Sequence, residues 1–234
     1  MIQVDVLSDP ICPWCYIGKR KIDQALNLVE TGNYILNWHP FQLNPDMPKP
    51  GMDRHLYLES KFGGAESARR AYGAVKAAAT ECGLRMQLDR IFRTPNTLDA
   101  HRLIYWAGAN GRQGELVDRL FHAYFVAGLD IGNPQVLTEI AGESGLDAND
   151  IAQRLKTEED KDRIRILDST FRAAGVRGVP CFLVDGRVIA SGAQPAEFWL
   201  TVLPRLAREP NSPAVRTPSG IRKRGSASQP AGTG

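Results

Sequence analysis

Two cysteines separated by two residues carry the most reactive chemistry in this chain. Cys12 and Cys15 lie in the stretch Ser-Asp-Pro-Ile-Cys-Pro-Trp-Cys (8–15), after a short apolar run at 2–7 and before apolar residues at helical spacing. This order of strand, loop, Cys-x-x-Cys and helix predicts that Cys12 lies at the first turn of a helix. Unpaired backbone N–H groups and the helix dipole favour a thiolate there. Pro13 suits the first helical position, because its missing N–H had no partner to lose.

A thiolate is the species that attacks disulfides, and at a helix start the pKa of a cysteine can fall from ~8.5 to between ~3.5 and ~7.5. We therefore expect Cys12 to act as a nucleophile. Cys15 follows about one helical turn later, and we expect this thiol to be buried, less ionised and close enough to form a disulfide with Cys12. The spacing predicts a redox-active pair.

Two plainer functions of this pair are disfavoured. A zinc site would need a second pair of ligands at close spacing, but Cys82 and Cys181 stand alone and the four histidines form no H-x3-H pair. We therefore expect no metal site. A purely structural disulfide is disfavoured because the only close pair lies at a helix start in a chain with no export signal.

Composition and charge exclude several other classes of protein. The chain has 234 residues, 43% of them hydrophobic, which suits one enlarged domain or one domain with an inserted module. With 29 Lys and Arg against 26 Asp and Glu, no nucleic-acid partner is indicated. No apolar run reaches the ~18 residues of a membrane span. Because the amino terminus lacks the features of a signal peptide, we expect a cytoplasmic protein, where cysteines are more often catalytic, metal-bound or free than structural.

The elements that position the two cysteines begin with a βαβ unit. A second strand is predicted at 34–41, followed by a polar, proline-containing linker or lid at 44–51. The next 120 residues carry no strand signal and indicate an inserted helical block. Its predicted helices are 54–62, 65–82, 98–108, 114–127, 134–144 and 147–174, the last in two pieces. Caps are expected at Thr97, at Asn133 before Pro134, and at Asp147.

The strand signal returns near the end of the chain. Strands are predicted at 181–184 and 187–191 around an Asp-Gly turn, with a closing amphipathic helix at 195–206. Pro180 cannot donate to a sheet, so it must begin its strand. From Arg208 on, apolar residues are nearly absent, and 208–234 is predicted to be a disordered tail.

Three further side chains have ordinary structural interpretations. Residues 93–97 form an irregular turn that ends in a cap, and helical chemistry alone favours His101, one turn later, on a polar face. His39 is most simply a half-buried strand residue. Cys82, beside a glycine at a helix end, is expected to be a small buried hydrophobe.

Four motifs in order give the chain a family resemblance. They are Cys-Pro-Trp-Cys-Tyr-Ile-Gly-Lys-Arg (12–20), the segment from Asn96 to His101, Gly-Val-Arg-Gly-Val-Pro (175–180) and Ser-Gly-Ala-Gln-Pro (191–195). Together they resemble the thioredoxin superfamily, specifically its DsbA-like group and, within it, the FrnE-like branch. The resemblance spans residues 1–207. A related arm, the 2-hydroxychromene-2-carboxylate isomerases and kappa-class glutathione transferases, shares the inserted fold but carries serine in place of the first cysteine.

The resemblance implies an α/β fold, thioredoxin-like, with a large all-helical insertion. The thioredoxin-like domain would comprise 1–50 and 175–207, and the inserted helical domain 51–174. The bond before Pro180 would be cis, with this turn against the two cysteines. The backbone of Val179 could then pair with an extended substrate strand. The substrate-binding residues implied in this way are Pro13, Trp14, Val179, Pro180, Asn96 and His101.

Two functions follow from the resemblance. The first is a cytoplasmic thiol–disulfide oxidoreductase acting on protein disulfides or dithiols, with Cys12 attacking and Cys15 resolving. Its direction depends on redox potentials, which the sequence does not give. The second is a glutathione-dependent isomerase or transferase, in which Cys12 would stand beside the glutathione sulfur. No bound cofactor is implied, glutathione is kept as a candidate co-substrate, and the oligomeric state is left open, a dimer included.

Two open points concern the thiols themselves. A redox-inert binding module on the same fold predicts a Cys12 pKa near ~8.5. Cys181 stands where relatives commonly carry an aromatic or other apolar residue, which puts a third sulfur near the pair. Its neighbours Val179 and Phe182 are both apolar and do not indicate which face of the strand it occupies. We favour a small buried hydrophobe over an additional resolving thiol.

Overall fold

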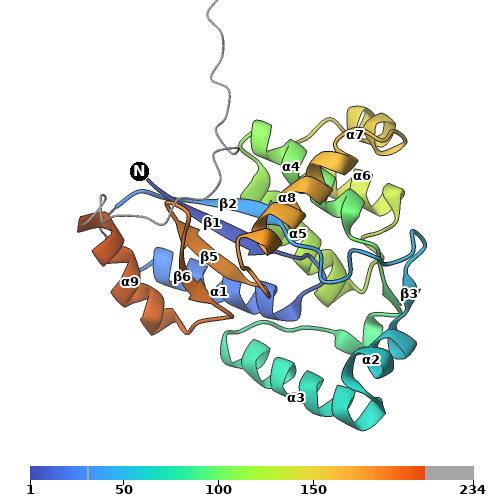
Figure 1. Cartoon of the computed structure of the whole chain (residues 1–234), viewed down its shortest axis with the longest axis horizontal. Helices are drawn as coiled ribbons and strands as arrows, with labels where there is room; N and C mark the ends of the chain where they lie inside the picture. Colours follow the sequence, from blue (N-terminus) through green and yellow to red (C-terminus); the bar gives the residue numbers. More distant parts are fainter. Residues whose placement is uncertain (31, 209–234) are drawn as a thin grey trace, which may run out of the picture.

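The computed structural model describes residues 1–30 and 32–208, and its centre is a four-stranded mixed sheet (Figure 1). The strand order is β2-β1-β5-β6. β1 pairs in parallel with β2 and antiparallel with β5, and β5 pairs antiparallel with β6. The strands are β1 (Ile2–Ser8), β2 (Tyr34–Pro40), β5 (Cys181–Val184) and β6 (Arg187–Ser191). The predicted βαβ unit and the predicted hairpin are both confirmed.

Side-chain alternation along β1 separates two apolar layers. Val4 and Val6 are fully buried in the larger hydrophobic cluster, which also holds both redox cysteines. Leu7, on the opposite face, belongs to a smaller cluster with Cys181. Because successive strand residues point to opposite faces, β1 is apolar on both sides near its carboxyl end, where Val6 and Leu7 are both fully buried.

Helices cover both faces of the sheet and extend the molecule on one side (Figure 1). α1 (Pro13–Leu26) packs beside α9 (Ala196–Arg208), and α8 (Lys161–Ala173) contacts β2. The remaining helices are α2 (Arg54–Phe62), α3 (Ala65–Glu81), the 3-10 turn η1 (Leu88–Arg90), α4 (Leu98–Ala109), α5 (Gln113–His122), the π-helical segment η2 (Ala123–Ala127), α6 (Pro134–Glu143) and α7 (Ala148–Leu155). The helical insertion is therefore confirmed.

The insertion shares its core with the thioredoxin-like part. Trp38 of β2 packs edge-on against Phe121 of α5, and the larger cluster continues from the sheet into α4, α5 and α6. Gln113 of α5 accepts from the Trp38 N–H at 2.8 Å and donates to the Trp38 carbonyl at 3.0 Å. The predicted boundaries of the inserted domain remain a prediction, since the apolar packing runs across them.

The structure corrects three expectations about the insertion. It contains strands after all: β3 (Met52–Asp53) pairs antiparallel with β4 (Arg93–Thr94), which occupies part of the turn predicted at 93–97. Two-residue strands are too short to show a periodicity. Thr97 occupies the predicted cap position of α4, but its side chain makes no cap bond, and Asn96 Oδ1 accepts from the Leu98 N–H instead.

The other caps and the chain ends can be compared with the prediction as well. Asn133 and Asp147 cap α6 and α7 as predicted. α9 extends through Arg208, so the predicted tail begins at least one residue too early, and its remainder, 209–234, lies outside the described residues.

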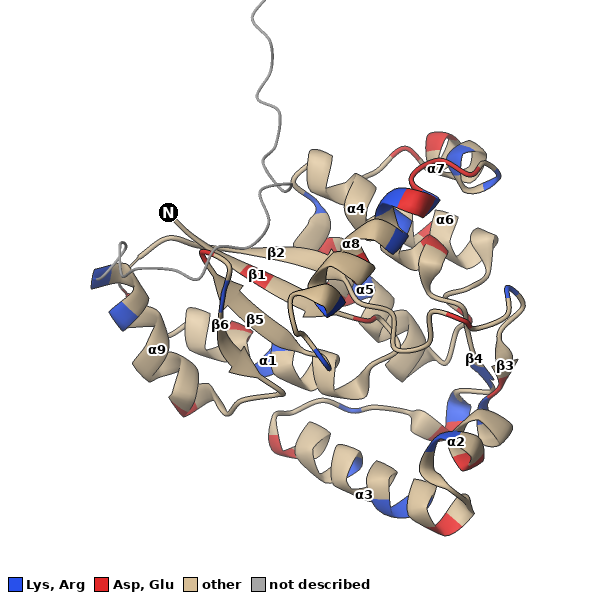
Figure 2. Cartoon of the chain, viewed as in Figure 1, with Lys and Arg blue, Asp and Glu red and all other residues tan. Residues whose placement is uncertain are grey.

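No helix in the described part of the chain is long and apolar enough to cross a membrane. Figure 2 shows basic and acidic residues interspersed over the face in view.

Candidate active site

The two cysteines lie at the amino-terminal end of α1, as the sequence predicts. Cys12 is the residue before the helix, with extended backbone, and Pro13 occupies the first helical position. The Cys12 carbonyl accepts from the Cys15 N–H at 3.0 Å, which closes the first turn and brings the two side chains to one end of the helix. Cys12 is 3% exposed and Cys15 1%, whereas Trp14 between them is 38% exposed. Both thiols are free.

A second chain segment meets Cys12 from the carboxyl-terminal part of the protein. The Val179–Pro180 peptide bond is cis, as the resemblance implies, and Cys12 Sγ donates to the Val179 carbonyl at 3.6 Å. Pro180 is buried, and its carbonyl accepts from the Gly192 N–H at 2.8 Å. Three of the four sequence motifs therefore meet at one point.

Gly18 lets this turn approach α1. A Cβ atom at this position would lie 2.9 Å from Pro180 Cγ and 3.6 Å from the Phe182 ring. A contact below 3 Å requires a shift of the neighbouring atoms, so only glycine permits the observed approach without one. Sequence reasoning missed this role, although a lone glycine inside a helix often marks close packing.

The two thiols have different electrostatic surroundings. Burial raises the pKa of the Cys15 thiol well above its usual value, and the neighbouring Cys12 sulfur raises it further. The nearby Ser8 hydroxyl and Asp9 N–H oppose this rise. Because a thiol is a poorer nucleophile than a thiolate, Cys15 is suited to wait for a disulfide held beside it rather than to attack first.

Asp9 is a fully buried carboxylic acid directly before this motif. Its oxygens accept from the Leu43 N–H at 2.7 Å and the Ile11 N–H at 3.3 Å, and the Thr97 hydroxyl also bonds to it. Burial raises the pKa of Asp9 to about 7, and these hydrogen bonds hold it from rising further. Asp9 thus ties the active-site loop to the segment after β2 and to the start of α4.

His101 lies behind this loop instead of on a polar face. It is 2% exposed, and its Nε2 atom lies 3.8 Å from Asp9 Oδ1. Burial lowers the pKa of His101 to about 3. The expectation of an exposed imidazole was wrong because the 98–109 helix is buried on most sides, so helical periodicity alone did not identify its solvent face.

Asn96 anchors the linker that precedes the insertion. Its Nδ2 donates to the Met47 carbonyl at 2.6 Å, while its Oδ1 caps α4 through Leu98. Asn96 and His101 therefore both support the loops around Cys12. Their predicted contact with substrate stays a prediction.

Cys181 faces away from the redox pair. It packs with Leu7, Phe41 and Phe171 on the far face of the sheet, whereas Cys12 and Cys15 belong to the other apolar cluster. Burial raises the pKa of the Cys181 thiol. These contacts support the interpretation of Cys181 as a small buried hydrophobe. Cys82, also buried, donates to the Ala79 carbonyl at 3.3 Å.

The first helices of the insertion contribute a polar wall that the sequence did not reveal. Arg54 is 6% exposed, donates to Thr94 and Tyr72, and contacts three tyrosine rings. Burial raises the pKa of Tyr72, with a smaller contribution from the charge of Cys12. In the described residues no carboxylate forms an ion pair with Arg54. Single polar residues on amphipathic helices carry no signal of such clustering.

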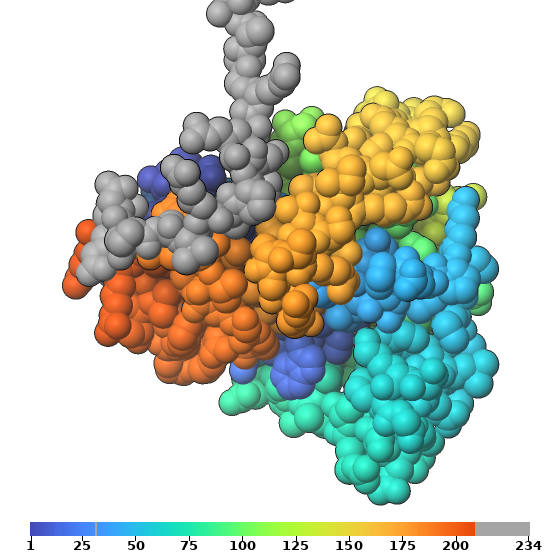
Figure 3. Space-filling model, viewed as in Figure 1, coloured from blue at the N-terminus to red at the C-terminus, as the bar shows by residue number. Residues whose placement is uncertain are grey.

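Figure 3 shows that the amino-terminal part of the chain reaches the surface on the face in view. A small blue patch from the amino-terminal part of the chain appears between the orange β5–β6 and α9 region and the cyan α2–α3 region. Within the described ranges, no group of three or more His, Cys, Asp or Glu residues is placed to hold a metal ion.

Two buried cysteines at the start of a helix, with a cis-proline turn against the first, define a thiol protein of the thioredoxin fold. The chain belongs to the DSBA-like thioredoxin domain family, which it matches over residues 3–203. It is 26% identical to the uncharacterized protein YwbO of Bacillus subtilis over 193 residues, or 82% of this chain and 91% of YwbO.

Solved structures share the fold over nearly the whole chain. A probable DsbA oxidoreductase from Streptomyces coelicolor, SCO1869, is 27% identical with a TM-score of 0.80, covering 99% of this chain and 100% of that one. A 2-hydroxychromene-2-carboxylate isomerase is 14% identical with a TM-score of 0.67, covering 89% and 98%. The cytosolic disulfide reductase DsbM from Pseudomonas aeruginosa, solved with GSH, is 18% identical with a TM-score of 0.62, covering 88% and 100%. At these lower identities the likeness concerns the fold alone.

Proposed function

We propose that this protein is a thiol–disulfide oxidoreductase in which Cys12 attacks a substrate disulfide and Cys15 resolves the mixed disulfide. The observation that carries the proposal is the difference between the two thiols. Cys12 lies at the helix start with its sulfur on the Val179 carbonyl, whereas burial raises the pKa of the Cys15 thiol. An exchange reaction needs an attacking and a waiting thiol of this kind.

The reaction balances without a bound cofactor. The Cys12 thiolate attacks one sulfur of the substrate disulfide, and the other substrate sulfur leaves with the electron pair and takes a proton from water. Cys15, after losing its proton, then attacks Cys12 Sγ, which forms the Cys12–Cys15 disulfide and releases the second substrate thiolate. The reverse sequence oxidises a substrate dithiol, and the potentials of the partners decide the direction.

Substrates would bind across the cis-proline turn. The Val179 backbone is available for strand addition to an extended peptide, and the partly exposed Trp14 and Pro13 flank the attacking sulfur. We infer protein disulfides or dithiols as substrates and glutathione as a candidate co-substrate, with Asn96 and His101 shaping the site from behind. A cytoplasmic location belongs to the same proposal and is supported by the fold that the chain shares with the cytosolic disulfide reductase DsbM.

The test is reduction of insulin by dithiothreitol, combined with trapping. We expect the wild-type protein to accelerate precipitation of insulin chains, Cys12→Ser to abolish the acceleration, and Cys15→Ser to accumulate mixed disulfides that mass spectrometry detects on Cys12. Cys82→Ser is the matched control, because this buried thiol lies outside the site. Trapping by Cys12→Ser but not by Cys15→Ser would reverse the assigned roles.

A second function is favoured by one observation, the shared fold with a 2-hydroxychromene-2-carboxylate isomerase. In a glutathione-dependent isomerase or transferase, Cys12 would stand beside the glutathione sulfur and Cys15 would take no part. This alternative predicts that Cys15→Ser retains full turnover of a chromene carboxylate with glutathione while insulin reduction is absent in the wild type.

A further inference from the structure

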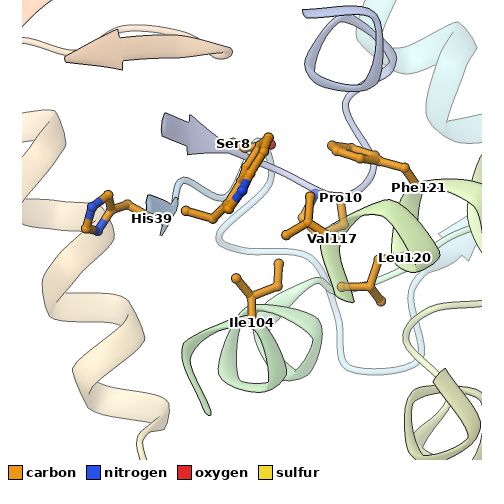
Figure 4. A pocket seen from close by; sticks show the side chains of 8 residues that line it. Ser8, Pro10, His39, Ile104, Val117, Leu120 and Phe121 are labelled. Carbon is orange, nitrogen blue, oxygen red and sulfur yellow. The ribbon is translucent and has the colours of Figure 1, made fainter. Parts of the chain in front are cut away.

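A small cavity lies between the sheet and helices α4 and α5. The centre of a water molecule has about 10 Å³ to move in it, which is enough for one water. Most of the lining is apolar, and Figure 4 shows the side chains of Ile104, Val117, Leu120 and Phe121 around the space. The lining is completed by Pro10 and by three side chains that carry polar atoms, Ser8, Trp38 and His39. The His39 ring is already bonded to Asp5 at 2.8 Å.

Ser8 and Trp38 carry buried polar atoms that the protein does not satisfy. Neither Ser8 Oγ nor Trp38 Nε1 has a hydrogen-bond partner among the described residues, and both residues are 5% exposed. They share one face of the sheet, because Val6 lies opposite Trp38 in the register and Ser8 follows Val6 by two residues. A buried polar atom without a partner is costly, so one water bonded to both atoms would remove two such costs.

Ser8 also reaches the resolving thiol. Its hydroxyl completes no hydrogen bond in the reduced protein, but its approach to the Cys15 sulfur, like that of the Asp9 N–H, favours the charged form of that thiol. A serine hydroxyl rotates freely and can donate one hydrogen bond while accepting two. Ser8 therefore lies between the cavity and Cys15, and its hydroxyl can donate to the sulfur while it accepts from a group in the cavity.

We propose that Ser8 is a catalytic residue of the resolving step, in which its hydroxyl donates a hydrogen bond to the Cys15 thiolate and accepts one from a water held in the cavity by Trp38. The donors then run in one direction, from the Trp38 N–H through the water and the Ser8 hydroxyl to the sulfur. Chains of this kind strengthen each bond in them. The inference rests on the proposed function, because only a resolving thiol has to become a thiolate.

The step balances with the groups already named. Cys15 gives its proton to bulk water, and the hydrogen bond from Ser8 stabilises the resulting thiolate. That thiolate attacks Cys12 Sγ, the Cys12–substrate S–S bond breaks, and the substrate sulfur leaves with the electron pair. The Cys12–Cys15 bond forms, and Ser8 keeps its own proton throughout.

The test separates the two chemical steps with Ellman's reagent in a stopped-flow instrument. The reduced protein should release one thionitrobenzoate when Cys12 attacks and a second when Cys15 resolves the mixed disulfide. We expect Ser8→Ala to leave the first phase within twofold of wild type and to slow the second about tenfold, because bonds to charged atoms are among the stronger hydrogen bonds. Ser8→Thr keeps the hydroxyl and should recover the second phase to within about threefold.

Two further variants test the cavity and the fold. Trp38→Phe removes the N–H but keeps a ring, and we expect the second phase to slow about threefold. Ser144→Ala is the matched control, a serine that is 1% exposed and bonded to the Ile140 carbonyl, and it should change neither phase. Thermal melting of each variant shows whether the fold is intact.

The outcomes distinguish this inference from the proposed function. An unchanged second phase in a folded Ser8→Ala protein would overturn the role of Ser8, and an unchanged second phase in folded Trp38→Phe would overturn the water-linked chain. Equal slowing of both phases by Ser8→Ala would show a structural effect and also overturn it. Release of only one thionitrobenzoate by the wild-type protein would instead overturn the proposed function.

Discussion

Asp9 and His101 form a buried pair whose titrations oppose each other, and this makes a strong prediction about stability against pH. Burial raises the pKa of Asp9 from 3.8 to about 7 and lowers the pKa of His101 from 6.5 to about 3. Between these limits both groups are neutral in the folded protein, so their 3.8 Å approach is a contact of neutral groups at pH 5.

The sign of each contribution follows from proton binding. Between pH 3.8 and about 7 the folded protein holds a proton on Asp9 that the unfolded chain has lost, so the free energy of unfolding falls as the pH rises. For His101 the unfolded chain holds the extra proton between about pH 3 and 6.5, so the free energy of unfolding rises with pH. Each slope is about 1.4 kcal/mol per pH unit, and in the wild type the two nearly cancel between about pH 4 and 6.5.

Single substitutions should expose these slopes. In Asp9→Asn the slope of His101 remains, and the free energy of unfolding should rise by about 1.4 kcal/mol per pH unit relative to wild type. In His101→Phe the slope of Asp9 remains, and it should fall by the same amount. The slopes of the two variants should therefore differ by about 2.7 kcal/mol per pH unit. Groups that titrate in the same way in both variants cancel in this difference.

Urea unfolding at pH 4.5, 5.5 and 6.5, followed by circular dichroism, measures these slopes. A constant loss of stability from changed packing or hydrogen bonding shifts each line without changing its slope. If both variants keep the wild-type slope, neither group is neutralised by burial. If either variant changes the slope in the direction opposite to the one expected, the assigned pKa shifts are wrong.

Three further predictions concern the surroundings of the site. Gly18→Ala should displace Pro180, whose Cγ would lie 2.9 Å from the new methyl carbon. Overpacking of this kind costs ~1–3 kcal/mol and outweighs the gain in helix propensity of ~1 kcal/mol. Urea unfolding should therefore show a lower free energy of unfolding than in the wild type, and a higher one would contradict the prediction. Cys181→Ala should keep most insulin reductase activity while Cys12→Ala abolishes it; a folded but inactive Cys181→Ala protein would bring the third thiol into the mechanism. Truncation after Arg208 should leave this activity intact, and its loss would show that the removed segment reaches the site.

Much of the fold could be predicted because its determinants are local. Alternating and helical apolar patterns, an Asp-Gly turn and the caps at Asn133 and Asp147 all act within a few residues. The β3–β4 ribbon could not be predicted, since each strand has only two residues and its pairing joins positions about forty residues apart. Long-range pairing of this length leaves no trace in a local pattern.

The site residues also differ in whether local sequence patterns or long-range packing determine their positions. Cys12 and Cys15 belong to one short motif, so their position at a helix start followed from the sequence. The turn at Val179 and Pro180 meets Cys12 across 167 residues, and this contact was expected only from the family resemblance. The burial of His101 against Asp9, by contrast, depends on how α4 packs behind the active-site loop. The same packing turns the Thr97 hydroxyl from its own helix toward Asp9, which a capping pattern cannot distinguish from an ordinary cap.

The helical insertion helps to hold the loop that precedes the redox pair. Asp9 receives hydrogen bonds from Leu43 and Thr97, one on each side of the inserted helices α2 and α3, so the insertion closes the loop that precedes Cys12. Cys15 is 1% exposed, and burial is the largest cause of its raised pKa. Exposure does not separate the two thiols, since Cys12 is 3% exposed. They differ in position, because Cys12 lies at the helix start against the Val179 carbonyl and Cys15 lies within the first turn of the helix.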